Sequence, residues 1–312
     1  MTWKVLVSAP YMQQVFDEFR PRFASADIEP VLPVVTERLS EAELLPLVGD
    51  IDGAICGDDA FTDIVLKRAP RLKVIAKWGT GIDSIDGAAC VRRGIAVRNT
   101  PDVFTEPVAD SVLAYILCFA RQTLTMNQAM HEGRWCKIPG RALNECTLGV
   151  IGVGRIGSAV VRRARAFGVR VLGHDVREIS SAFVAETGLV VVDLDTLLRE
   201  ADFVSLNCEL NPRNRHLIGP RELSLMRRSA VLINTARGPI VNEVALVAAL
   251  QSGHLGGAAL DVFEHEPLPE DSALRQMPNV LMAPHNSNTS PRAWARAHES
   301  TFRNLLEELT RE

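Results

Sequence analysis

Residues 150–161 read VIGVGRIGSAVV, and this glycine-rich turn decides the fold. An apolar strand predicted over 148–152 runs into the turn, and a helix is predicted to follow it. In the pattern G-x-G-x-x-G, Gly152 permits a tight turn, Gly154 lets a phosphate approach the backbone, and Gly157 lets the helix lie close to the strand. A pyrophosphate can then bind at the N-terminus of the helix. The turn therefore predicts a dinucleotide-binding site.

The carboxylate of Asp175 strengthens this interpretation, because a glycine-rich turn alone is common. Asp175 ends the next apolar run, 18 residues past Gly157, where it is expected to accept hydrogen bonds from the adenosine ribose hydroxyls. A carboxylate there repels a 2′-phosphate, so NAD is favoured over NADP. Two alternatives stay open: Asp175 could be a structural residue of a turn, and the nearby Arg177 leaves room for both cofactors.

Short apolar, β-branched runs alternate with amphipathic segments along the whole chain. Fully apolar strands that are bounded by turn residues and separated by helices indicate parallel sheets buried on both faces. The sequence therefore predicts the α/β class with doubly wound parallel sheets. The predicted strands lie in the runs 4–8, 31–35, 53–57, 73–79 and 94–100, and then in 148–154, 169–175, 203–208, 231–238, 257–263 and 280–285.

The position of the glycine-rich turn indicates two domains, one inserted into the other. The sequence ahead of the turn holds five predicted strands, enough for a separate unit. After the last predicted strand only residues 286–312 remain. They are enough for one helix, with Ser290 as its expected N-cap, but too few for a domain. We predict a nucleotide-binding domain over 101–285, inserted into a first domain formed by 1–100 and 286–312.

The composition argues against several classes of partner. The chain has 312 residues, 47% of them hydrophobic and 23% charged, so it can form packed cores. A net charge of −4 and a pI near 6.0 give no electrostatic reason to expect a nucleic acid or a membrane as partner. The most apolar predicted helix, 108–121, contains Asp110 and is too short to cross a bilayer.

The N-terminus and the cysteines predict a cytoplasmic protein. The first residues, MTWKVLVSAP, begin a strand almost at once and form no long apolar leader. The cysteines show no CxxC spacing and no pairing with histidines, so reduced thiols are expected rather than disulfides or a metal site. They are Cys56, Cys90, Cys118, Cys136, Cys146 and Cys208.

Three polar stretches follow predicted strands and carry groups suited to catalysis. VLMAPHNSNTSP (280–291) places His285 after an apolar run, and INTARGPIVN (233–242) places Arg237 just past another. GAALDVFEHEP (257–267) holds three carboxylates and a histidine within six residues. A histidine can exchange a proton near neutral pH, and an arginine can bind a carboxylate bidentately. Taken singly, each has an ordinary alternative: a loop histidine, an arginine that fixes a loop, and an exposed acidic loop.

Together these stretches resemble the D-isomer-specific 2-hydroxyacid dehydrogenase family, which includes phosphoglycerate dehydrogenases. The resemblance covers nearly the whole chain, and the ordered set is far more specific than any of its parts. It implies an NAD-dependent oxidoreductase that transfers a hydride between the nicotinamide and a D-2-hydroxy acid or 2-keto acid. It also implies a Rossmann domain inserted into a flavodoxin-like substrate domain. The matching segments are KWGTGIDSID (77–86), NTPDVFTEPVAD (99–110), GVIGVGRIG (149–157), INTARG (233–238), ALDVFEHEP (259–267) and APH (283–285).

The resemblance assigns catalysis to Arg237, Glu266 and His285. His285 is expected to exchange the proton that accompanies hydride transfer. Glu266, hydrogen-bonded to the other ring nitrogen, is expected to favour the imidazolium, since an adjacent opposite charge raises such a pKa by roughly 1–3 units. Arg237 is expected to hold the substrate carboxylate and to polarise the carbonyl.

The resemblance also implies the binding residues. The turn at 79–81 is expected to donate backbone N–H groups to the same carboxylate, and Asp261 matches the family position that orients the nicotinamide carboxamide. The predicted substrate-binding residues are Lys77, Gly79, Thr80, Gly81 and Arg237. The predicted cofactor-binding residues are Gly152, Gly154, Arg155, Ile156, Gly157, Asp175, Cys208, Thr235, Ala236 and Asp261.

The substrate stays open between two kinds. Lys77 lies where some phosphoglycerate dehydrogenases carry a basic residue near the substrate phosphate, so 3-phosphoglycerate is one candidate. If Lys77 faces water instead, a glyoxylate or hydroxypyruvate reductase is the alternative.

Two departures from the family pattern bear on the site. Residues 207–209 read NCE where the family often has His-x-Pro beside the adenine pocket, and 286–289 are polar where the family is apolar and glycine-rich.

Residues 105–135, which include Arg121 and Trp135, resemble the family's dimerisation region. A homodimer through the NAD-binding domain is therefore expected.

A function of another class also stays open, an NAD(H)-sensing corepressor-like binding protein on the same scaffold, because such relatives keep the Arg–Glu–His set. The lack of long disordered tails and of a basic patch favours the enzyme.

Overall fold

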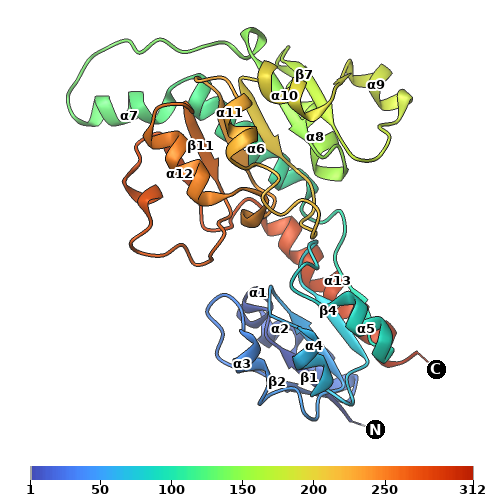
Figure 1. Ribbon diagram of the computed structural model, residues 1–312. Coiled ribbons are helices and arrows are strands. Elements are labelled where there is room, and N and C mark those ends of the chain that lie inside the picture. Colours follow the sequence, from blue (N-terminus) through green and yellow to red (C-terminus); the bar gives the residue numbers. More distant parts are fainter. Residues whose placement is uncertain (1, 312) are drawn as a thin grey trace. The chain divides into compact units, whose positions relative to one another are not determined.

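The computed structural model describes residues 2–311, which form two compact units (Figure 1). Unit 1 comprises Met1–Phe104 and Ser290–Glu312, and unit 2 comprises Thr105–Thr289. Each unit has its own sheet, and every strand pairing in both sheets is parallel. The prediction of an α/β fold with two parallel sheets is therefore confirmed.

Local contacts explain where the chain passes from one unit to the other. Both crossings lie four residues beyond the predicted ones. Before the first crossing, the ring of Phe104 lies 5.3 Å from the ring of Trp78, which belongs to unit 1. Before the second, the amide of Asn286 donates a hydrogen bond to Asp261, which belongs to unit 2. Each contact keeps a few more residues in the unit that the chain is leaving.

Unit 1 has a five-stranded sheet with the order β2-β1-β3-β4-β5. This is the flavodoxin-like order of doubly wound folds. Its strands are β1 (Trp3–Val7), β2 (Ile28–Val31), β3 (Gly53–Cys56), β4 (Val74–Lys77) and β5 (Ala96–Arg98). Its helices are α1 (Pro10–Gln14), α2 (Phe16–Ser25), α3 (Glu41–Leu44), α4 (Asp63–Lys67), α5 (Gly87–Arg93) and α13 (Pro291–Leu309).

The C-terminal helix α13 completes the core of unit 1. Its N-cap is Ser290, whose hydroxyl accepts a hydrogen bond from the amide of Ala293, as the sequence predicts. The helix packs on β3, β4 and β5. The side chain of Leu305 lies only 2.9 Å from where a Cβ on Gly53 would be, so a glycine in β3 lets the helix approach the sheet.

Unit 2 has a seven-stranded sheet with the order β12-β11-β10-β9-β6-β7-β8. The strands β8, β7, β6, β9, β10 and β11 lie in the Rossmann order 3-2-1-4-5-6, which reverses beside β6, the strand that runs into the glycine-rich turn. The strands are β6 (Thr147–Ile151), β7 (Arg170–His174), β8 (Val190–Val191), β9 (Phe203–Leu206), β10 (Val231–Asn234), β11 (Gly257–Leu260) and β12 (Val280–Met282). The helices are α6 (Thr105–Ala120), α7 (Thr123–His131), α8 (Arg155–Ala166), α9 (Ser181–Thr187), α10 (Leu194–Glu200), α11 (Pro220–Leu225) and α12 (Glu243–Gln251), with short 3-10 turns η1 (Leu143–Glu145), η2 (Gly238–Ile240) and η3 (Ala273–Gln276).

Helices cover both faces of the unit 2 sheet, which explains why its central strands are apolar throughout. Alternate residues of β10 point to different cores: Val231 and Ile233 pack with α6 and α8, whereas Leu232 packs with α10, α11 and α12. A central strand such as β10 therefore carries apolar residues on both faces rather than at every second position.

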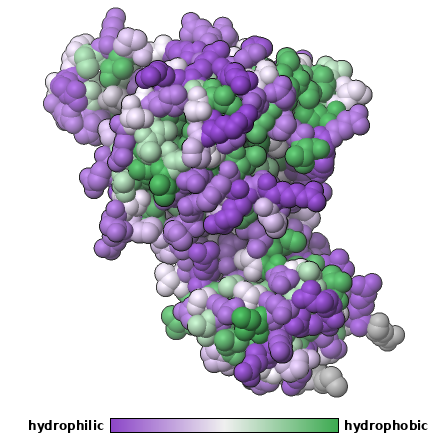
Figure 2. Space-filling model, viewed as in Figure 1, coloured by the Kyte–Doolittle hydropathy of each residue, from purple (hydrophilic) through white to green (hydrophobic). Residues whose placement is uncertain are grey.

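Within residues 2–311, no helix is both long enough and apolar enough to span a bilayer. On the face shown in Figure 2, hydrophobic residues form small groups that are separated by hydrophilic ones.

The packing of Phe302 predicts how strongly unit 1 depends on α13. Phe302 is buried, and its ring lies 5.7 Å from that of Phe19 and 5.0 Å from that of Phe23 in α2. Replacing Phe302 by Ala should lower the free energy of unfolding by about 3–5 kcal/mol through the cavity it leaves. Denaturant unfolding of this variant and of Arg303→Ala, a neighbour on the exposed side of the helix, would measure the difference. Equal losses in the two variants would contradict the prediction.

Candidate active site

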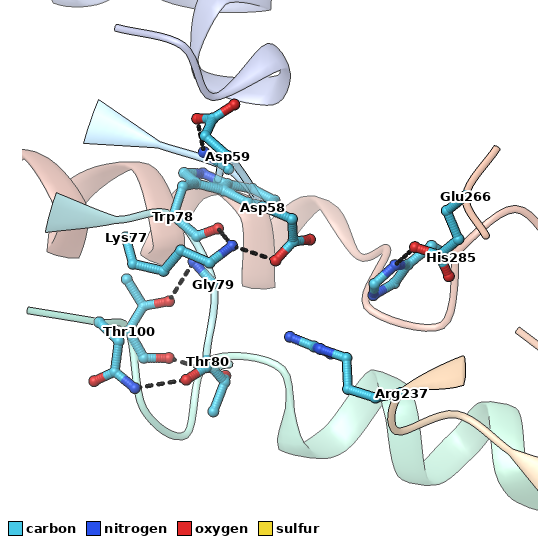
Figure 3. Close-up of polar contacts among 12 residues, drawn as sticks. Asp58, Asp59, Lys77, Trp78, Gly79, Thr80, Thr100, Arg237, Glu266 and His285 are labelled. Atoms are coloured by element: carbon cyan, nitrogen blue, oxygen red, sulfur yellow. Dashed lines mark hydrogen bonds and ion pairs between the residues drawn. The ribbon is translucent and has the colours of Figure 1, made fainter. Parts of the chain in front are cut away.

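Three adjacent parallel strands of unit 2 end at the candidate active site. β12, β11 and β10 are neighbours in the sheet, and ligands of such sheets bind beyond the carboxyl ends of the strands. Arg237 follows β10, Glu266 follows β11 and His285 follows β12. The three side chains that the sequence predicts to carry catalysis therefore come from neighbouring loops at one edge of the sheet (Figure 3).

The loop that carries Arg237 is fixed by its own backbone and by the loop after β11. Asn234, buried at the end of β10, accepts a hydrogen bond from the amide of Ala236 at 3.1 Å and donates one to the carbonyl of Arg237 at 2.9 Å. A Cβ on Gly238 would lie only 1.8 Å from the carbonyl oxygen of Phe263. A glycine is therefore required for the two loops to lie backbone against backbone.

His285 and Glu266 form the contact that the sequence predicts. Nδ1 of His285 lies 3.2 Å from Oε2 of Glu266, and Oε1 of Glu266 accepts a hydrogen bond from the amide of Phe263 at 3.0 Å. The carboxylate is thus held from both sides, and it fixes the orientation of the imidazole ring. Any proton exchange with a substrate would take place through Nε2, the ring nitrogen turned away from Glu266 (Figure 3).

Asp261 holds the turn that carries His285. Its side chain is 1% exposed, and its two carboxylate oxygens accept hydrogen bonds from the amides of Asn286 at 2.7 Å and Ser287 at 3.0 Å. Its carbonyl accepts one from the amide of His285 at 2.8 Å, where the backbone has a φ of 51°. The resemblance implies that Asp261 orients the nicotinamide carboxamide, but the structure shows it binding this turn. These contacts use backbone amides, so they fix the turn whatever the side chains of residues 286–289 are.

The glycine-rich turn fits a dinucleotide. Gly152 has a φ of 85°, and a Cβ there would lie 2.7 Å from the amide nitrogen of Cys208. A Cβ on Gly157 would lie 2.0 Å from the carbonyl oxygen of Gly152, so the helix lies directly on the strand. At Gly154, by contrast, only the guanidinium of Arg177 comes within 4 Å, at 3.4 Å. The backbone at Gly154 is therefore open to a phosphate, as the G-x-G-x-x-G pattern requires.

Asp175 presents a carboxylate that stays ionised. It accepts hydrogen bonds from the amides of Val153 and Arg177, both at 2.8 Å. Burial alone raises the pKa of Asp175, but these hydrogen bonds and the charge of Arg177 outweigh it and hold the pKa below its usual range. The group thus carries a full negative charge at the end of β7, where the adenosine ribose of a bound dinucleotide is expected.

Two more observations fit a dinucleotide. The hydroxyl of Thr235 and the side-chain oxygen of Asn207 are buried without a hydrogen-bond partner among residues 2–311, so a bound ligand could supply one. Burial raises the pKa of the Cys208 thiol to about 11, so this side chain beside the glycine-rich turn is uncharged at neutral pH. The remaining predicted cofactor residues, Arg155 and Ile156, form the first turn of α8 beside the open backbone.

In unit 1, the loop after β4 offers fewer donors than predicted. The amide of Gly79 donates to the hydroxyl of Thr100 at 3.2 Å, so it is engaged within the protein. The amides of Thr80 and Gly81 donate to no acceptor in the described part of the chain. Lys77, predicted to face either a phosphate or water, does not face water: it is 3% exposed and donates a hydrogen bond to Asp58 at 2.9 Å.

A second histidine–glutamate pair joins the active-site loops, and no motif in the sequence predicts it. Nε2 of His216 contacts the carboxylate of Glu264, and the amide of His216 donates to the carbonyl of Pro239 at 2.8 Å. His216 lies in the loop after β9, so this one residue joins it to the loops after β10 and β11. Asn234 and Thr100 were also missed, although both lie inside motifs that the resemblance covers.

Comparison with known proteins identifies the family. Residues 113–287 match the family described as D-isomer specific 2-hydroxyacid dehydrogenase, NAD binding domain. A glyoxylate reductase from Korarchaeum cryptofilum is 36% identical over 304 residues, which cover 95% of this chain and 88% of the relative. A D-3-phosphoglycerate dehydrogenase from Methanocaldococcus jannaschii is 37% identical over 265 residues, which cover 83% of this chain but 50% of the relative.

The solved structures agree. A D-lactate dehydrogenase from Aquifex aeolicus, complexed with NAD and lactic acid, superimposes with a TM-score of 0.85 at 30% identity, covering 96% of this chain and 93% of the other. This chain belongs to the D-isomer specific 2-hydroxyacid dehydrogenase family. It is an NAD-dependent dehydrogenase, and the predicted family, enzyme class and cofactor type are confirmed.

The charge of Asp175 predicts the choice between NADH and NADPH. Replacing Asp175 by Ser should raise the ratio of kcat/KM for NADPH over NADH by at least about tenfold, equivalent to about 1.4 kcal/mol, because the 2′-phosphate no longer meets a carboxylate. Since the pKa of Asp175 is lowered, its carboxylate is charged wherever the 2′-phosphate, whose second pKa is about 6, is also fully ionised, so the wild-type ratio should not change between about pH 7 and 8.

Initial rates with each cofactor would test both statements. Asp193→Ser makes the same change at the N-cap of α10, where a serine still caps the helix, and should leave the ratio unchanged. A ratio in Asp175→Ser that stays at the wild-type value would show that Asp175 is not the group that discriminates.

Proposed function

We propose that this protein reduces a small 2-keto acid, such as glyoxylate or hydroxypyruvate, to the 2-hydroxy acid with NADH. The observation that carries the proposal is the contact between Nδ1 of His285 and Glu266 at 3.2 Å, at the sheet edge that also carries Arg237. An oriented histidine supplies a proton, and an arginine beside it supplies a carboxylate-binding group.

The chemistry divides among these residues. The nicotinamide, when bound, supplies the hydride that attacks the carbonyl carbon. Nε2 of His285 gives a proton to the carbonyl oxygen as the carbon–oxygen double bond becomes a single bond. The charge of Glu266 stabilises the protonated ring before this transfer. Arg237 binds the substrate carboxylate through two parallel hydrogen bonds, which sets the carbonyl in place.

Unit 1 contributes backbone donors in this proposal. Thr80 and Gly81 have amides without an acceptor in the described structure, and such groups suit an anion. The loop is held by Thr100, which accepts from the amide of Gly79 and, through its carbonyl, from the hydroxyl of Thr80 at 3.3 Å. We therefore assign Thr80 and Gly81, rather than Gly79, to binding of the substrate carboxylate.

Glyoxylate or hydroxypyruvate is favoured over 3-phosphoglycerate. The predicted phosphate-binding residue, Lys77, is buried and paired with Asp58. The relatives that match over most of their length include glyoxylate reductases, whereas the phosphoglycerate dehydrogenases match over half of theirs.

A panel of keto acids tests the proposal. NADH consumption would be followed with glyoxylate, hydroxypyruvate, pyruvate, branched 2-keto acids and phosphohydroxypyruvate, and turnover should be fastest with one of the first two. Replacing His285 by Asn should lower kcat by about 10²–10⁴-fold, the usual contribution of a general acid. His254→Asn is the control, since His254 contacts the carbonyl of Leu223 away from the edge described above. NADH binding without turnover of any member would favour an NAD(H)-sensing binding protein instead.

We also propose a homodimer through unit 2. The segment after α6 exposes large apolar side chains: Trp135 is 88% exposed, and Leu124 and Met130 of α7 are about half exposed. Exposed apolar side chains of this size within one segment are typical of protein interfaces. Replacing Trp135 by Glu should shift the molecular mass measured by light scattering from dimer to monomer, while Val244→Glu, an exposed apolar residue of α12, should not. A wild-type monomer would refute the assembly.

The cytoplasm stays the predicted location, with which the free cysteines are consistent.

A further inference from the structure

Two oppositely charged side chains meet at the carboxyl edge of the unit 1 sheet. β3 and β4 are adjacent parallel strands. Asp58 lies just after β3, and Lys77 is the last residue of β4. The loop with the open amides of Thr80 and Gly81 begins two residues further on. The pair therefore lies at the base of the loop to which the proposed function assigns the substrate carboxylate.

The lysine is the buried half of this pair and the aspartate is the exposed half. Nζ of Lys77 donates to Oδ1 of Asp58 at 2.9 Å and lies 3.5 Å from the carbonyl oxygen of Trp78. It also lies 3.2 Å from where a Cβ on Gly79 would be, so the ammonium is covered by the loop. The side chain of Lys77 is 3% exposed and that of Asp58, its partner in Figure 3, is 31% exposed. A ligand that approaches this edge meets the carboxylate and not the ammonium.

The residue after Asp58, Asp59, also carries a carboxyl group. Asp59 is fully buried and accepts hydrogen bonds from the hydroxyl of Ser8 at 2.6 Å and from the amides of Leu39 and Gly57. Burial raises the pKa of Asp59, so the group is either neutral or a second negative charge.

Aromatic rings form the next part of the same edge. The ring of Tyr11, which follows β1, lies 5.1 Å from that of Trp78 and 4.8 Å from that of Trp294. β1 is the neighbour of β3 on its other side. Rings and a carboxylate together suit a short, uncharged substrate tail, such as hydrogen or a hydroxymethyl group.

We propose that Asp58 is a specificity-determining residue: by holding Lys77 in an ion pair, it makes the enzyme reject 2-keto acids that carry a second negative charge. This inference rests on the proposed function, because it concerns the tail of the same substrate. A phosphate or second carboxylate would have to displace Asp58 from Lys77 or lie against the aspartate with the same sign of charge. Discrimination of this kind works by an unfavourable contact with the wrong substrate.

The matched substrates are hydroxypyruvate and phosphohydroxypyruvate, which differ only by the phosphoryl group. In the wild type, kcat/KM should be higher for hydroxypyruvate. Replacing Asp58 by Asn removes the charge but keeps an oxygen that can accept from Lys77. This variant should raise the ratio of kcat/KM for phosphohydroxypyruvate over hydroxypyruvate by at least about tenfold. The double variant Asp58→Asn, Lys77→Met should lose that gain, because no ammonium remains to bind the phosphate.

A control variant separates a local effect from a general change of charge. Asp50→Asn removes the same charge in unit 1, at the loop that precedes β3, where Asp50 pairs with Lys4. It should leave the ratio at the wild-type value. An unchanged ratio in Asp58→Asn, or a gain that persists in the double variant, would overturn the proposal.

Two further measurements keep the test independent of folding and of turnover. If Asp58→Asn does not fold, the wild type alone decides: equal or better use of phosphohydroxypyruvate overturns the inference. If the wild type reduces no keto acid, the proposed function fails, and inorganic phosphate then tests Asp58 by itself. Phosphate should raise the Tm of Asp58→Asn by more than it raises that of the wild type, because it binds the uncovered lysine. Equal rises would refute the assignment.

Discussion

Asp261 is buried at the end of β11, and its two carboxylate oxygens accept hydrogen bonds from the amides of Asn286 and Ser287. A buried carboxylate is costly unless it is fully hydrogen-bonded, so these bonds fix the turn after β12. The same residue's carbonyl holds the amide of His285. The position of the His285 backbone therefore depends on the neighbouring strand β11. Glu266 then fixes the orientation of the imidazole ring.

Much of the architecture follows from local rules. The glycine-rich turn, its flanking strand and helix, and the apolar runs predicted both sheets, because parallel strands covered on two faces have a distinctive composition. The contact of Glu266 with His285 was also predicted, through a resemblance that places the two residues in separate motifs. The structure shows that contact, while the catalytic roles of the two residues, and of Arg237, stay predictions.

What could not be predicted concerns contacts between positions distant in sequence. A lysine at the end of a strand has the same sequence pattern whether it faces water, a ligand or an acid, so nothing indicated that Lys77 meets Asp58, 19 residues earlier. The same holds for the amide of Gly79 and the hydroxyl of Thr100. In both cases the strand order of the sheet decides, because it brings the ends of adjacent strands together. Sequence periodicity carries no information about which strand lies next to which.

The return of α13 to unit 1 affects the order in which the two units can fold during synthesis. Unit 2 is one continuous segment, whereas unit 1 needs both ends of the sequence. A ribosome releases the N-terminal end first, so Phe19 and Phe23 emerge long before Phe302, the residue that packs on them. Domains fold as units once their residues are available. The inserted domain can thus complete its core first, and the domain that hosts it completes its core only after α13 has emerged.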